Sequence, residues 1–249
     1  YIGSILTEML LGKGYDVTGY DTDYYSDCAL YEYKIPQKQI RKDIRDVSVE
    51  DLKGMDAVIH LAALSNDPLG QFDVSLTEEI NLKASIKLAQ CARTAGVKRF
   101  IYSSSQSMYG ISDSDEELDE DNSLKNPQTA YARTKWEAEG ELRKMSSPDF
   151  AVVCFRPSTV FGASPKLRCD IVFNNLVACA YTTGRIEIKS DGSPWRPVVH
   201  IRDVSQAFIA GLRAPLDLIF NQSFNVGIKD GNFTVKGLAQ AAQACVPAS

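Results

Sequence analysis

The chain has 249 residues, of which 44% are hydrophobic, enough for one large domain with a smaller appendage. Its formal net charge of −5 leaves no basic surface, so nucleic acid is not expected as a partner. Six single cysteines and two histidines, none in a metal-ligand spacing, predict neither a disulfide framework nor a metal site.

No run of about 18 apolar residues and no signal peptide is visible. We therefore expect a cytoplasmic protein that does not enter a membrane. The sequence starts inside a helical pattern without Met and stops soon after another, at "TVKGLAQAAQACVPAS". These two ends suggest a fragment that lacks the first strand and the C-terminus of a longer protein.

Short apolar runs alternate with segments of helical periodicity through the first 160 residues. The predicted helices cover residues 3–12, 77–95 and 128–145. The predicted strands cover residues 15–20, 56–63, 98–105 and 150–157. Buried strands separated by amphipathic helices predict an α/β fold with a doubly wound, Rossmann-type parallel sheet covered on both faces.

The alternation loosens after about residue 160. Helices are expected over 170–182 and 203–213, a strand at 223–227 and a last helix from residue 234. Pro, Gly, Trp and Arg gather between residues 184 and 197. We expect residues 161–249 to form a smaller region, interleaved with the sheet and folded over its carboxyl edge.

Gly3 opens the first predicted helix, and Asp21 ends the next strand 18 residues later. That spacing fits the third glycine of a G-x-G-x-x-G fingerprint and the acidic residue that binds an adenosine ribose. A carboxylate at this position disfavours the 2′-phosphate of NADP. A strand-ending Asp is equally often a simple turn residue, so this signal alone decides little.

Tyr131 and Lys135 in "PQTAYARTK" stand one helical turn apart on one face of the 128–145 helix. A tyrosine with a pKa of about 10 is a poor base at neutral pH, but a neighbouring ammonium favours its phenolate. An isolated Y-x-x-x-K would more often be an exposed aromatic beside a solvated lysine. Ser105, in "FIYSSSQSMYG", stands 26 residues upstream at the carboxyl end of a strand, where open α/β sheets bind ligands.

With these residues the chain resembles the extended short-chain dehydrogenase/reductases, specifically the NAD-dependent nucleotide-sugar epimerases and dehydratases. The resemblance runs from Tyr1 to about Ala239. The motifs that carry it include "YIGS", "VIHLAALS", "SSSQSMYG", "YARTK", "RPSTVFG" and "DGSPWRPVVHIRDV". It implies that residues 1–160 form an NAD-binding Rossmann domain without its first strand, and that residues 161–249 form a truncated substrate-binding region.

The resemblance implies a role for each matching position. The implied catalytic residues are Ser105, Tyr131 and Lys135. The implied cofactor-binding residues are Tyr1, Ile2, Asp21, Asp43, Ile44, Leu61, Ala62, Ala63, Asn81, Ser103, Tyr131, Lys135 and Pro157. The implied substrate-binding residues are Ser105, Thr159, Asn175 and Arg196, of which Arg196 suits a diphosphate because its planar fork reaches two oxygens at once.

Two features depart from the family pattern, and the second limits the reactions that the protein could catalyse. Thr159 stands where the family commonly has Asn, which puts that sugar contact in doubt. Gln106 and Ser107 stand where 4,6-dehydratases carry an Asp-Glu pair, and neither can act as a general acid or base. Lys166 and Arg168 could assist the diphosphate or simply be exposed, and His60 and His200 are expected to be structural.

We therefore expect an NAD-dependent nucleotide-sugar epimerase that acts at C4 through a 4-keto intermediate. The alternatives are a reductase of nucleotide-4-keto-sugars that consumes NADH, and a non-catalytic NAD-binding scaffold. The resemblance also implies a homodimer formed through the helices at 77–95 and 128–145. If the fragment lacks the phosphate loop, it should bind NAD poorly on its own.

Overall fold

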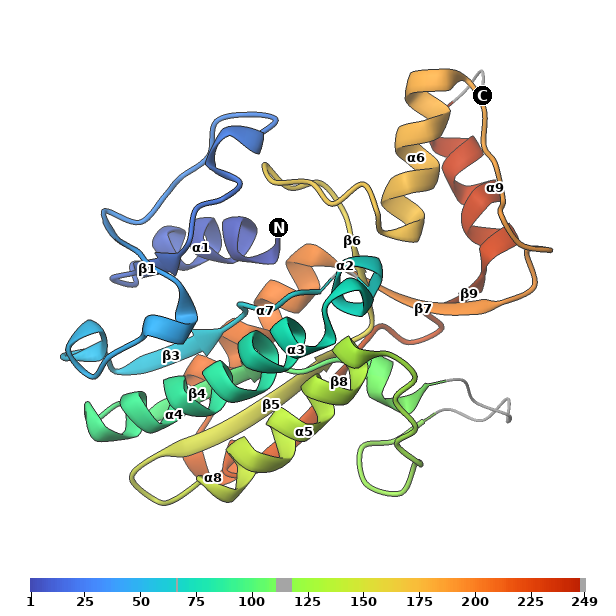
Figure 1. The fold of residues 1–249 in the computed structure, drawn as a ribbon. Coiled ribbons are helices and arrows are strands. Elements are labelled where there is room, and N and C mark those ends of the chain that lie inside the picture. Colours follow the sequence, from blue (N-terminus) through green and yellow to red (C-terminus); the bar gives the residue numbers. More distant parts are fainter. Residues whose placement is uncertain (66, 111–117, 247–249) are drawn as a thin grey trace.

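Four parallel strands form the central sheet of the computed structural model, which describes residues 1–65, 67–110 and 118–246 (Figure 1). They are β3 (Ala57–His60), β4 (Arg99–Ser103), β5 (Ala151–Pro157) and β8 (Gln222–Val226), hydrogen-bonded in the order β3-β4-β5-β8. A separate parallel pair, β1 (Thr18–Asp21) and β2 (Lys38–Arg41), lies beside the first helix. The doubly wound parallel α/β fold predicted from the sequence is confirmed.

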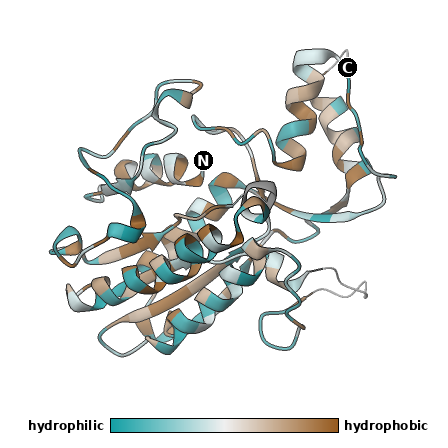
Figure 2. Cartoon of the chain, in the orientation of Figure 1, coloured by the Kyte–Doolittle hydropathy of each residue, from teal (hydrophilic) through white to brown (hydrophobic). Residues whose placement is uncertain are grey.

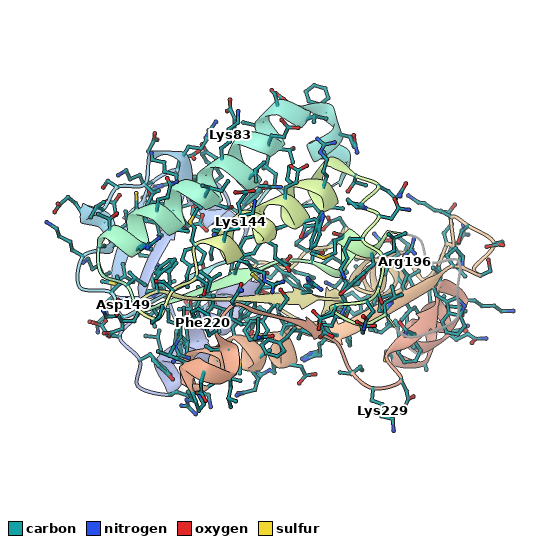
Figure 3. The ribbon with its side chains drawn as sticks, turned by 90° about the horizontal axis from the view of Figure 1, so that it is seen from below. Lys83, Lys144, Asp149, Arg196, Phe220 and Lys229 are labelled. Atoms are coloured by element: carbon teal, nitrogen blue, oxygen red, sulfur yellow. The ribbon has the colours of Figure 1, made fainter. Side chains whose placement is uncertain are left out.

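Helices cover both faces of the central sheet (Figure 3). On one face lie α4 (Ala84–Thr94) and α5 (Ala130–Lys144), and on the other lie α1 (Ile2–Gly12), α7 (Ile201–Arg213) and the short α8 (Leu216–Ile219). Side chains of a strand alternate between the faces, so Phe100 and Tyr102 belong to the first core while Ile101 belongs to the second. This two-sided burial explains why the central strands read as continuous apolar runs. Figure 2 shows the same pattern as brown strands beneath helices that carry teal and brown residues.

The helix predicted over residues 77–95 is interrupted by a π-helical turn. After the short α2 (Asp67–Phe72), α3 (Val74–Glu78) leads into the π turn Glu79–Lys83, which continues as α4. Asn81 lies inside this turn and is fully buried. Such single π turns often mark functional positions because the extra residue redirects a side chain.

A second group of elements lies beside the central sheet, at the upper right of Figure 1. Its sheet contains β6 (Thr159–Phe161), β7 (Trp195–His200) and β9 (Asn232–Thr234), with β6 and β7 parallel and β9 antiparallel to β7. Helices α6 (Val172–Thr183) and α9 (Val235–Cys245) contact each other above it. Leu176, Val198 and Leu238 form the small core of this group.

The first predicted strand begins later than its sequence suggests. Residues 15–17 precede β1, because Tyr15 donates its backbone N–H to the Leu10 carbonyl at the end of α1. Gly14 supplies the positive φ of 81° that this C-terminal turn requires. None of the helices in the described ranges is both long and apolar enough to cross a membrane.

Candidate active site

The carboxyl ends of the central strands meet at one edge of the sheet because all four strands are parallel. Ser105 follows β4 by two residues, and Pro157 is the buried last residue of β5. Leu61, Ala62 and Ala63 follow β3 directly. Residues that lie far apart in the sequence are therefore gathered at this edge.

Ser105 is held by the turn that it begins. It is the N-cap of the 3-10 turn Gln106–Tyr109 (η5), and its Oγ accepts a hydrogen bond of 3.2 Å from the backbone N–H of Ser107. A hydroxyl that accepts from the backbone still has its own proton to donate. Ser105 is partly exposed, so a ligand at the sheet edge can reach this donor.

Helix α5 carries the other two candidate catalytic residues. Thr129 caps its N-terminus by accepting a 3.1 Å hydrogen bond from the backbone N–H of Ala132. Lys135 Nζ lies 6.0 Å from the centre of the Tyr131 ring. The same Nζ donates a 2.7 Å hydrogen bond to the carbonyl of Ser103, two residues before Ser105. The structure therefore brings Lys135 together with Tyr131 and with the strand end that leads to Ser105.

Lys135 is almost completely enclosed, with 2% of its surface exposed. Burial lowers its pKa from 10.5 to about 7, because removing the ammonium from water penalises the charged form. The Tyr102 ring, whose centre lies 4.7 Å from Nζ, supports the cation without neutralising it. The ammonium next to Tyr131 can thus lose or gain its proton near neutral pH.

The first turn of α1 fits a phosphate group. Tyr1 is the N-cap residue and its side chain makes no capping hydrogen bond, so the N–H groups of the turn that begins at Ile2 are available to an anion. The Tyr1 hydroxyl instead contacts the Gly162 carbonyl (3.1 Å) and the Asn174 amide (3.2 Å). A Cβ on Gly3 would meet Leu61 at 3.7 Å, an ordinary contact, so helix–strand packing does not require glycine there.

The two acidic candidates occupy different environments. Asp21 is exposed at the end of β1 and accepts a 2.8 Å hydrogen bond from the backbone N–H of Asp23, so it does serve the turn. Asp43 accepts from Arg45 through the backbone N–H, Nε and Nη2, and these bonds lower the pKa of the Asp43 carboxyl. Ile44 beside it is buried. Both carboxylates are thus present as hydrogen-bond acceptors on the side of the sheet where β1 and β2 lie.

Asn81 binds the backbone that follows β3. Its Oδ1 accepts from the N–H of Leu64 (2.8 Å), and its Nδ2 donates to the Leu64 carbonyl (3.0 Å) and to Thr134 Oγ1 (3.3 Å). These bonds fix the residue next to Leu61, Ala62 and Ala63. Asn81 therefore holds this backbone segment in place and joins it to α5 through Thr134.

The substrate-side candidates lie on the second group of elements. Thr159 begins β6 and is partly exposed, whereas Asn175 is exposed and donates through Nδ2 to the Cys169 carbonyl. Arg196 is exposed on β7, at the end of the molecule opposite Asp149 in Figure 3. Trp195 is 61% exposed, which excludes a role as a core residue.

Two polar residues join the segments around this edge. The sequence leaves the role of Arg168 open and does not single out Asn174. Arg168 donates to Ser65 Oγ (2.8 Å) and is paired with Asp170, so it is engaged rather than free. Asn174 is buried and binds the Tyr1 hydroxyl, the Gly162 N–H and the Arg168 carbonyl. Neither could be found from local spacing, since Asn174 lies 173 positions from its partner Tyr1.

The two histidines have structural partners. His60 is buried and forms a 2.8 Å hydrogen bond with Ser85 Oγ, while burial lowers its pKa to about 3. His200 is the N-cap of α7 and accepts from the N–H of Arg202. In the part of the chain that the structure describes, no group of three His, Cys, Asp or Glu could hold a metal ion.

A doubly wound parallel sheet with Tyr131, Lys135 and Ser105 at its carboxyl edge defines a short-chain dehydrogenase/reductase of the nucleotide-sugar type. The chain belongs to the NAD dependent epimerase/dehydratase family, whose model matches residues 1–227, and its cofactor is NAD.

The relatives include different activities. The chain is 31% identical to a UDP-glucose 4-epimerase of Mycolicibacterium smegmatis over 91% of its own length and 74% of that protein. It is 27% identical to a dTDP-4-dehydro-6-deoxy-D-allose reductase of Streptomyces over 83% of its length and 68% of that protein. The structure of MoeE5 in complex with UDP-glucose and NAD matches with a TM-score of 0.82 and 26% identity, over 98% of this chain and 78% of that one.

Proposed function

We propose that this protein is an NAD-dependent nucleotide-sugar 4-epimerase. The observation that carries the proposal is the placement of Lys135 between Tyr131 and the carboxyl end of β4, close to Ser105. A base and a hydrogen-bond donor at one strand end are what the oxidation of a secondary alcohol requires. The 31% identity to a UDP-glucose 4-epimerase supports the same reaction.

Tyr131, as the phenolate, takes the proton of the sugar 4-hydroxyl, while Ser105 donates a hydrogen bond to the same oxygen. NAD, when bound, would supply the acceptor and donor of two electrons that oxidation and re-reduction at C4 need. Lys135 stabilises the phenolate through its ammonium and is fixed by the Ser103 carbonyl. If the 4-keto sugar turns over before the hydride returns, the configuration at C4 is inverted.

The turn after Ser105 supports epimerisation over dehydration. Gln106 and Ser107 open η5, and Ser107 is exposed while its backbone N–H is bonded to Ser105. Removal of water from C5 and C6 needs a general acid and a general base at the sugar. An amide and a hydroxyl supply neither at neutral pH.

The second candidate function is reduction of a nucleotide-4-keto-sugar. The similarity to a dTDP-4-dehydro-6-deoxy-D-allose reductase favours it, because the same three side chains would deliver the proton in the reverse direction. A reductase consumes NADH stoichiometrically, whereas an epimerase leaves the total NADH unchanged. A non-catalytic NAD-binding scaffold would do neither.

The site is tested with a panel of nucleotide-sugars, with products read by NMR and NADH by absorbance. Tyr131→Phe removes the hydroxyl that moves the proton, so kcat should fall by about a hundredfold to ten-thousandfold with NAD binding retained. Tyr15→Phe is the matched control, since the Tyr15 hydroxyl accepts from Arg213 at the surface. Equal activity of Tyr131→Phe and the unmodified protein would refute the assignment.

The proposal also covers the binding of cofactor and substrate, the compartment and the oligomeric state. We propose that residues 1–160 bind NAD, that residues 161–249 bind the nucleotide-sugar, and that Arg196 and Asn175 contact its diphosphate. We also propose a cytoplasmic homodimer that pairs through the helical segments 77–95 and 128–145. Sedimentation of the full-length protein tests the dimer.

A further inference from the structure

A buried ion pair joins β5 to α5, the helix that carries Tyr131 and Lys135. Arg156 on β5 is 1% exposed and Glu139 on α5 is fully buried. Arg156 Nη2 lies 2.6 Å from Glu139 Oε1, and Arg156 Nε lies 3.1 Å and 3.2 Å from the two carboxylate oxygens. A buried ion pair is often no more stabilising than apolar residues of the same size, because desolvation offsets the attraction. Stability alone therefore does not explain why this ion pair is present.

The second arm of the Arg156 guanidinium reaches the turn that Ser105 begins. Nη1 donates to the Tyr109 hydroxyl (2.8 Å) and to the Glu120 carbonyl (3.0 Å). The Tyr109 hydroxyl donates in turn to Asn225 Oδ1 on β8 (2.9 Å). Tyr109 is the last residue of η5, and Ser105 is its N-cap. The network therefore holds the C-terminal end of the turn that Ser105 begins.

The same network also holds the helix that carries the proposed base. Tyr131, Lys135 and Glu139 follow each other at intervals of four residues, so they share one face of α5. Lys135 binds the Ser103 carbonyl, and Glu139 binds Arg156. Helix α5 is therefore fixed to the β4–η5 segment on both sides of Ser105, at Ser103 and at Tyr109.

We propose that Arg156, Glu139 and Tyr109 are positioning residues, which fix the Ser105 hydroxyl relative to Tyr131 by joining η5 to α5. The rigid, planar guanidinium suits this task because it binds a carboxylate with one edge and a phenol oxygen with another. This inference rests on the proposed function, in which Ser105 and Tyr131 act on the same oxygen of the sugar. Remote positioning residues affect turnover because small displacements of reacting groups slow the chemical step strongly.

The test compares Tyr109→Phe with Ser223→Ala in the full-length protein. Tyr109→Phe keeps the ring and removes only the hydroxyl that joins η5 to Arg156 and Asn225. Ser223→Ala removes a 2.7 Å hydrogen bond to the same Glu139 carboxylate, but from β8 rather than from η5. We expect Tyr109→Phe to lower kcat about tenfold or more, with the KM for the nucleotide-sugar and the affinity for NAD nearly unchanged. Ser223→Ala should keep kcat within about twofold.

Amide hydrogen exchange of residues 104–110 gives a readout that needs no substrate. Tyr109→Phe should speed exchange in this segment, while Ser223→Ala should not, because exchange follows local opening. Unchanged exchange, or faster exchange with unchanged kcat, would overturn the proposal. If the unmodified protein converts no nucleotide-sugar, the proposed function fails, and exchange alone then decides whether the network holds the turn.

Discussion

Lys135 shows at the scale of one residue how chemistry and stability oppose each other. Its pKa falls from 10.5 in the unfolded chain to about 7 in the folded protein because it is buried. Between these values the folded state binds fewer protons than the unfolded state, so the stability of the protein rises with pH across this window. Below pH 7 the buried ammonium is charged and its desolvation cost is fully present.

Replacing Lys135 with Met should therefore stabilise the protein while abolishing its activity. At pH 7 we expect the free energy of unfolding to rise by about 1–3 kcal/mol, because a buried charge is replaced by an apolar chain of similar length. The rise in stability between pH 7 and 10 should also become smaller. Urea denaturation at three pH values measures both effects, with the exposed Lys83→Met as the control. A less stable variant with an unchanged pH dependence would contradict this account.

Whether the role of a residue could be predicted depends on how far it lies from its partners in the sequence. The Tyr131–Lys135 pair could be predicted because both lie on one helix, four residues apart. The contacts of Arg168 with Ser65 and of Asn174 with Tyr1 span more than 100 residues, so no local pattern reports them. The same holds for Arg156, whose carboxylate, phenol and carbonyl partners come from three separate segments.

At the scale of elements, the close approach of α7 to the sheet depends on Gly211. A Cβ built on Gly211 would lie 2.7 Å from Phe155 Cε2 and 3.4 Å from Ile101 Cδ1. Both neighbours belong to the core between α7 and the strands β4 and β5. The absence of a side chain therefore sets the distance between this helix and the sheet.

We expect Gly211→Ala to destabilise the protein by about 1–3 kcal/mol, because the added methyl overpacks this contact. Gly140→Ala in α5 is the matched control, since a Cβ there meets nothing within 4 Å. That change should stabilise the helix by about 0.5–1 kcal/mol, because glycine is a poor helix former. Thermal unfolding of both variants measures the difference. Stabilisation by both substitutions would show that α7 has room for the methyl.

The elements that sequence patterns predicted are those with a strong periodic signal. The central strands β3, β4, β5 and β8 and the long helices were found because each buries a continuous run or one face. The strands β2, β6, β7 and β9 were not predicted. Two of them have three residues each, and β7 contains Pro197, which cannot donate to the ladder and argues against a strand. The π turn at Glu79–Lys83 also leaves no periodic signal of its own.

At the scale of the whole molecule, the central sheet and the α6–α9 group meet around polar contacts. The Tyr1 hydroxyl, at the start of α1, donates to the Gly162 carbonyl. Arg168 crosses from the segment before α6 to Ser65, in the segment after β3. Arg168 is partly buried, and its ion pair with Asp170 orients the guanidinium. If the nucleotide-sugar contacts Tyr131 and Ser105 through its sugar and Arg196 through its diphosphate, as proposed, this bridge holds the two sides of its site together.

Replacing Arg168 with Met should therefore weaken substrate binding more than it slows the chemistry. The change keeps an unbranched apolar stem but removes the charged hydrogen bonds to Ser65 and Asp170, and we expect this loss to raise KM about tenfold. We expect kcat to change less than KM, because the hydrogen bonds of Arg168 go to Ser65 and Asp170, although its charge also acts on Tyr131. Arg185→Met, an exposed arginine just after α6, is the control for the loss of one positive charge from the same part of the protein. Steady-state kinetics with the best nucleotide-sugar of the panel decide the matter, and a loss of kcat at constant KM would place Arg168 in the chemical step instead.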